Sequence, residues 1–128
     1  MGDRESLYPA DWLRVAELDL KRVEDRLALH DPADAGFHLQ QAVEKFLKAF
    51  LLSKGWRLRR IHNLDALLDD AVSYDPGLDA FRPVCVRISA FYFVERYPLR
   101  LEAAPSEADV RAALAEVGGL IDMLRTST

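Results

Sequence analysis

Hydrophobic side chains recur along most of the chain at intervals of three and four residues, the period of an amphipathic α-helix. The first such stretch covers about residues 9–29, and Pro9 suits its first turn because no N–H group is needed there. The second covers about residues 33–54 and stops at Gly55, a residue that favours helix ends. The apolar seams of these two helices are Leu13, Ala16, Leu20, Val23 and Leu27, and Leu39, Ala42, Phe46, Ala49 and Phe50.

Three more helices are predicted downstream. Asn63 is a plausible N-cap for a short helix, and a turn follows at residues 74–77. A fourth helix covers about residues 78–95, with Pro83 either kinking it or opening its main segment. Ser106 and Asp109 resemble a capping box, so the last helix begins there and runs to near the C-terminus. No stretch alternates with a period of two, and we predict an all-α fold, an up-and-down four-helix bundle with an additional short helix.

Composition narrows the class of protein. The length of 128 residues suits one domain, and 30% charged residues is an ordinary globular balance. The one cysteine, Cys85, lies in an apolar run and is expected in the core; no Cys/His spacing suggests a metal site. The sequence shows no signal peptide and no long apolar run, so we expect a cytoplasmic protein without a membrane segment.

Positive charge is concentrated in one part of an acidic chain. The formal net charge is −4, which argues against general coating of DNA. A local basic patch on such a body favours a defined anionic ligand or an acidic partner surface. Between Glu44 and Asp65 no acidic residue interrupts six cations: Lys45, Lys48, Lys54, Arg57, Arg59 and Arg60.

The second helix carries a polar stripe. Gln41, Glu44, Lys45 and Lys48 fall on one face because they are spaced three and four residues apart. Taken by itself, this spacing is typical of a solvated helix face with local Glu–Lys pairs, and a binding face is the alternative.

Two further positions are candidates for binding. His62 precedes a predicted helix start, where free N–H groups and the helix dipole favour an anion, and Arg57 lies nearby in sequence. The alternative is that His62 only packs against the second helix. At the end of the fourth helix, Arg96 can bind a phosphate and Tyr97 can stack on a base, or the two can simply anchor the helix end.

Catalytic motifs are scarce. The sequence contains no paired-carboxylate, Ser/His/Asp or Gly-rich phosphate-loop pattern. Arg57 and His62 form an Arg-x4-His spacing, which in a ribonuclease could stabilise and protonate a cleaved backbone. Two residues at a tolerant spacing occur often by chance, so this is the least favoured function.

Three motifs in order resemble the small prokaryotic HEPN domains. They are residues 40–49 (QQAVEKFLKA), the triplet at 62–64 (HNL) and the triplet at 96–98 (RYP), and residues 10–13 and 16–20 also fit. The resemblance implies an all-helical bundle that forms homodimers, binds nucleotides and often pairs with a minimal nucleotidyltransferase as a toxin–antitoxin module. Some HEPN proteins are metal-independent ribonucleases with Arg-x4–6-His near the last long helices. This chain has no histidine after Arg87, so no catalytic residue is assigned.

We therefore predict a single HEPN-like domain over residues 1–128, with its core at about 9–125. It is expected to be a homodimer that binds a nucleotide or RNA and acts with a minimal nucleotidyltransferase partner. No metal or cofactor of its own is expected. The alternative is a protein-interaction module without a small ligand. The predicted ligand-binding residues are Gln41, Lys45, Lys48, Arg57, His62, Arg96 and Tyr97.

Overall fold

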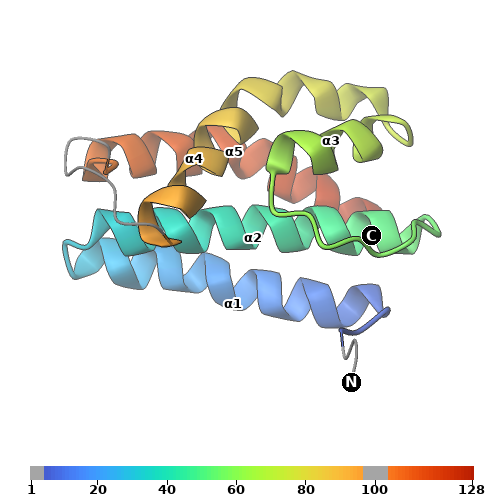
Figure 1. The fold of residues 1–128 in the computed structure, drawn as a ribbon, viewed down its shortest axis with the longest axis horizontal. Coiled ribbons are helices and arrows are strands. Elements are labelled where there is room, and N and C mark those ends of the chain that lie inside the picture. Colours follow the sequence, from blue (N-terminus) through green and yellow to red (C-terminus); the bar gives the residue numbers. More distant parts are fainter. Residues whose placement is uncertain (1–4, 97–103) are drawn as a thin grey trace.

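The computed structural model describes residues 5–96 and 104–128, and these form a helical bundle (Figure 1). No strand occurs among them, so the predicted all-α class is confirmed. Helices α1 and α2 form an antiparallel hairpin, while α3, α4 and α5 pack against α2, which is the central helix. In chain order the elements are α1 (Pro9–Ala28), α2 (Pro32–Ser53), α3 (Leu64–Val72), the 3₁₀ helix η1 (Pro76–Phe81), α4 (Arg82–Arg96) and α5 (Glu107–Ser127).

Local sequence signals set several helix ends. The side chain of Asn63 accepts a hydrogen bond from the backbone N–H of Asp65, which confirms it as the N-cap of α3. Ser106 and Asp109 form the predicted capping box at the start of α5. Gly55 follows α2 with a φ of 88°, a conformation that glycine adopts without strain.

The region before α4 differs in detail from the prediction. The expected helix over 78–95 is divided into η1 and α4, with α4 starting at Arg82. Pro83 therefore opens the main segment rather than kinking it, because a first turn needs no N–H group there. Arg82 fixes this junction by ion pairs to Asp65 and Asp69 of α3 and to Asp79 of η1.

One continuous core lies between the helices, and α2 contributes its largest share. Cys85 is fully buried, as predicted from its apolar surroundings.

The two adjacent glycines of α5, Gly118 and Gly119, have different surroundings. A Cβ atom on Gly119 would lie 3.2 Å from the ring of Phe81, whereas one on Gly118 would meet nothing within 4 Å. The close approach of α5 to η1 therefore explains Gly119 but not Gly118.

No helix in the described part of the chain combines the length and the apolar character that a membrane span requires.

Candidate ligand-binding site

A buried polar cluster lies on α2 beneath the loop that joins α2 to α3. Glu44 and Lys48 are each 3% exposed, and Gln40 is fully buried. Lys48 Nζ donates to Glu44 Oε2 at 3.0 Å, and Gln40 Nε2 donates to Glu44 Oε1 at 3.0 Å. Gln41 Nε2 donates to Gln40 Oε1 at 2.7 Å, which extends the chain of bonds toward the surface. A solvated helix face is therefore the wrong interpretation of this stripe, because two of its charges are removed from water and paired with each other.

His62 joins the loop to this cluster. Its backbone carbonyl accepts a hydrogen bond from Gln40 Nε2 at 2.8 Å, and its Nδ1 lies 3.1 Å from Glu44 Oε1. The imidazole ring stacks on the ring of Tyr92 in α4, with centroids 5.0 Å apart and planes at 15°. Half of the side chain, 52%, is still exposed. Contact with α2 and access to a ligand are thus compatible at this residue.

The helix start after His62 is only partly available to an anion. The backbone N–H of Asp65 is bonded to the side chain of Asn63 at 2.8 Å. That of Leu64 is bonded to Ser89 Oγ at 2.9 Å. These two donors of α3 already have acceptors, so a ligand near His62 must rely mainly on side chains.

A hollow of about 330 Å³ opens above the cluster; we call it the Trp12 hollow. Lys48 Nζ lies 5.4 Å from the centroid of the Trp12 ring, so the indole and the ammonium group are neighbours in its wall. The predicted site residues Gln41, Lys45, Lys48 and His62 are brought together here. The full lining is Glu5, Trp12, Gln41, Glu44, Lys45, Lys48, Arg60 and His62.

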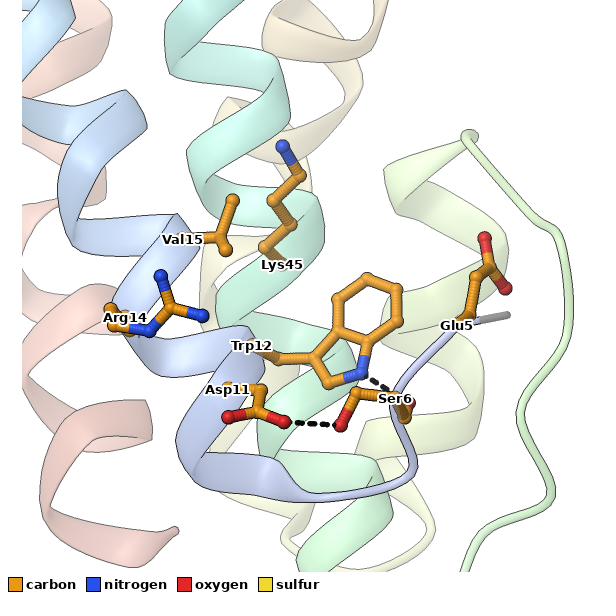
Figure 2. A pocket seen from close by; sticks show the side chains of 7 residues that line it. All are labelled: Glu5, Ser6, Asp11, Trp12, Arg14, Val15 and Lys45. Atoms are coloured by element: carbon orange, nitrogen blue, oxygen red, sulfur yellow. Dashed lines mark hydrogen bonds between the residues drawn. The ribbon is translucent and has the colours of Figure 1, made fainter. Parts of the chain in front are cut away.

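The N-terminal segment completes the wall. Trp12 Nε1 donates to the backbone carbonyl of Ser6 at 2.7 Å, and Ser6 Oγ donates to Asp11 at 2.6 Å. A neighbouring hollow has a volume of about 310 Å³. In Figure 2 its Trp12 ring lies between Lys45 and the segment that carries Glu5 and Ser6. Both hollows share Glu5, Trp12 and Lys45, so the tryptophan ring borders both spaces.

A second buried polar group positions Lys45. Asp19 of α1 is 2% exposed, and its carboxylate accepts a hydrogen bond from Lys45 Nζ at 2.6 Å. His38 Nδ1 lies 2.9 Å from the other oxygen of Asp19. Asp19 was not among the predicted site residues. The signal was present, however, because Asp19 lies three residues after Ala16 and four before Val23, on the buried face of α1.

Arg57 and His62 line different hollows. Arg57 lines a separate hollow of about 340 Å³ together with Trp56, Arg59, Asp70, Ser73 and Tyr74; we call it the Trp56 hollow. The Arg-x4-His spacing therefore does not converge on one hollow, which weighs against the ribonuclease function.

The remaining predicted residues are Arg96 and Tyr97. Arg96 is the last residue of α4, one turn beyond Tyr92, the ring on which His62 stacks. The Arg96 side chain and all of Tyr97 are outside the described residues. In the described part, no group of three or more His, Cys, Asp or Glu side chains is placed to hold a metal ion.

The fold agrees with what sequence comparison finds. A profile of the HEPN domain matches residues 9–127, nearly the whole chain. The protein belongs to the HEPN domain family. This HEPN chain is also similar to a solved structure, the crystal structure of TT1696 from Thermus thermophilus. The two share 23% sequence identity with a TM-score of 0.80, over 94% of this chain and 98% of the other, so the likeness is one of fold. No protein with curated annotation matches the sequence.

Proposed function

We propose that this HEPN domain binds a nucleotide or a short RNA in the Trp12 hollow. The observation that carries the proposal is the convergence of Lys45 and Lys48 from α2 with Arg60 and His62 from the following loop, around one hollow. A volume of about 330 Å³ lies within the range of small-molecule sites.

The lining offers both parts of nucleotide recognition. Lys45 and Lys48 each bond a carboxylate, but an ammonium group has three protons, so each keeps donors for a phosphate. The Trp12 ring supplies a flat apolar surface on which a base can stack. Gln41 adds an amide group at the same wall, which can fix the orientation of a ligand.

A minimal nucleotidyltransferase partner and a homodimer are part of this proposal. Their support is membership of the HEPN family together with the exposed basic loop around Arg57 and Arg59. Arg96 and Tyr97 are proposed to contribute a phosphate contact and a stacking ring from the end of α4.

One observation favours the alternative of a pure interaction module. Lys48 and Lys45 are already neutralised by Glu44 and Asp19, and Glu5 also lines the hollow. The excess of positive charge inside the hollow is therefore small, whereas the loop outside it is strongly basic. In that case the loop would dock an acidic protein surface, and no small ligand would be bound.

Thermal unfolding with ATP, GTP and short RNA distinguishes these functions. A ligand at about 100 times its Kd should stabilise the fold by roughly 2.7 kcal/mol. The variant Arg60→Ala should reduce the shift in Tm, because it removes one cation from the hollow. Arg111→Ala is the control, since it removes an exposed arginine of α5.

Unchanged melting curves with all three ligands would refute nucleotide binding in the Trp12 hollow. An acidic protein that co-purifies and is released by salt would support the interaction module instead. Cleavage of RNA that is lost in His62→Ala would revive the ribonuclease function.

A further inference from the structure

The Trp56 hollow combines side chains that the Trp12 hollow does not use. Its wall comes from the loop after α2 and from the end of α3, and it holds two aromatic rings and two arginines. The loop residues are divided between the two hollows: Arg57 and Arg59 line this one, whereas Arg60 and His62 line the other. The basic loop therefore contributes side chains to two separate hollows.

The two rings of the Trp56 hollow are held in place but remain accessible. Trp56 Nε1 donates to Asp70 Oδ2 at 2.9 Å, which fixes the indole against α3. The Tyr74 ring makes an edge contact with Phe50, with centroids 6.4 Å apart and planes at 81°. Tyr74 is nevertheless 46% exposed. A large ring that is anchored by the core and open to solvent is a suitable surface for stacking.

The arginines retain free donors. Arg57 is exposed, and the described residues offer it no hydrogen bond or ion pair. Arg59 Nη1 lies 3.4 Å from Asp70 Oδ2, a long contact that occupies only one of five N–H groups, and its side chain is 59% exposed. With Asp70 as the one carboxylate of the lining, the two guanidinium groups leave the hollow positive.

We propose that the Trp56 hollow is a second binding site, which holds one nucleotide. Its base stacks on Tyr74 and Trp56, and its phosphate is bound by Arg57 and Arg59. The aromatic rings favour this ligand over an acidic peptide, because a carboxylate needs the arginines but gains nothing from a stacking surface. The nucleotide can be free or part of a single-stranded RNA, since both present a base and a phosphate. The proposal does not depend on ligand binding in the Trp12 hollow.

The two tryptophans of the chain make each hollow separately observable. In Trp12→Phe the remaining indole, Trp56, reports on the second site; in Trp56→Phe the remaining indole, Trp12, reports on the first. Each variant is titrated with AMP, UMP and a ten-nucleotide RNA, and tryptophan fluorescence is followed. We expect quenching of Trp56 fluorescence in the first variant. Quenching of Trp12 alone would support the Trp12 hollow and overturn the second site.

Further substitutions in the Trp12→Phe background test the contacts. Tyr74→Ala should weaken binding about tenfold or more, and Tyr74→Phe should bind like its parent because the ring is kept. Arg57→Ala should lower the slope of log affinity against log salt for RNA by about 0.7, the loss of one phosphate contact on a single strand. Arg111→Ala, which removes a distant exposed arginine, should leave that slope unchanged.

The titrations also identify the source of the nucleotide. Tighter binding of the RNA than of AMP and UMP supports an RNA residue in the hollow, and equal binding supports a free nucleotide. The proposal is overturned if Trp56 fluorescence does not change with any of these ligands. It is also overturned if binding is unaffected by Tyr74→Ala in a variant shown by circular dichroism to be folded. Poly-glutamate that binds as tightly as RNA would also overturn it and assign the loop to an acidic protein.

Discussion

Replacing Lys48 with methionine tests whether the buried ion pair under the loop is strongly coupled. The change keeps most of the side-chain volume but removes the ammonium group that bonds Glu44 Oε2 at 3.0 Å. Both side chains are almost completely buried, at 3% and 4% exposure. The carboxylate of Glu44 then stays in a low-dielectric site without its closest counter-charge.

The magnitude follows from the distance and the burial. At an effective dielectric constant of 20, unit charges 3.0 Å apart attract each other by about 5 to 6 kcal/mol. Losing one partner of a buried pair costs about 3 to 5 kcal/mol. We expect the lower end, about 3 kcal/mol, because Gln40 and His62 still contact Glu44.

A double-mutant cycle measured by urea unfolding isolates the pair. The four proteins are the parent, Lys48→Met, Glu44→Gln and the double variant, and the free energy of unfolding is obtained for each. Glu44→Gln keeps an acceptor for Gln40 but leaves the ammonium group buried alone. The double variant should be more stable than the sum of the single changes implies, with a coupling energy of about 2 to 3 kcal/mol.

An exposed pair with the same spacing provides the control. Lys21 and Asp25 lie four residues apart at 3.2 Å, with side chains 74% and 53% exposed. Their cycle should give a coupling energy of only about 0.2 to 0.5 kcal/mol, since solvent screens the charges. A coupling this small at Glu44 and Lys48 would show that water reaches the pair, and the reasoning from burial would be refuted.

Three further predictions concern local features. Burial raises the pKa of Cys85 to about 12, so the thiol should not react with a disulfide reagent at pH 8 until urea unfolds the chain. The hydrogen bonds from the backbone and side chain of Ser106 hold the pKa of Asp109 below its usual value. This stabilisation is present above the unfolded-state pKa of Asp109 and is lost as the pH falls through the folded-state pKa. When the pH is lowered from 5 to 3, the free energy of unfolding of Asp109→Asn should therefore fall by less than that of the parent protein. Gly118→Ala should raise stability by about 0.5 to 1 kcal/mol in thermal unfolding, whereas Gly119→Ala should gain less because a ring lies 3.2 Å from the new Cβ atom.

The sequence by itself determined the helices, several of their ends and the family. The capping box of Ser106 and Asp109 and the N-cap of Asn63 involve groups two or three residues apart, so they are visible in any short window of the chain. The spacing of apolar residues along a helix is equally visible in a short window, because it repeats every three or four residues. The sequence left open whether Pro83 kinks the fourth helix or opens its main segment, because the ion pairs of Arg82 to Asp65 and Asp69 of α3 form only in the folded chain.

Only the tertiary structure decided which polar residues are buried and which meet. Asp19 and Lys45 are 26 residues apart in the chain, and their pairing depends on the packing of α1 against α2. Glu44 and Lys48 are buried where His62 of the loop contacts Glu44 and Trp12 of α1 lies next to Lys48, which spacing on α2 cannot reveal. The same loop separates Arg57 from His62, although the sequence places them five residues apart. Helix formation depends on neighbours within a turn, whereas burial and site geometry depend on segments that only folding brings into contact.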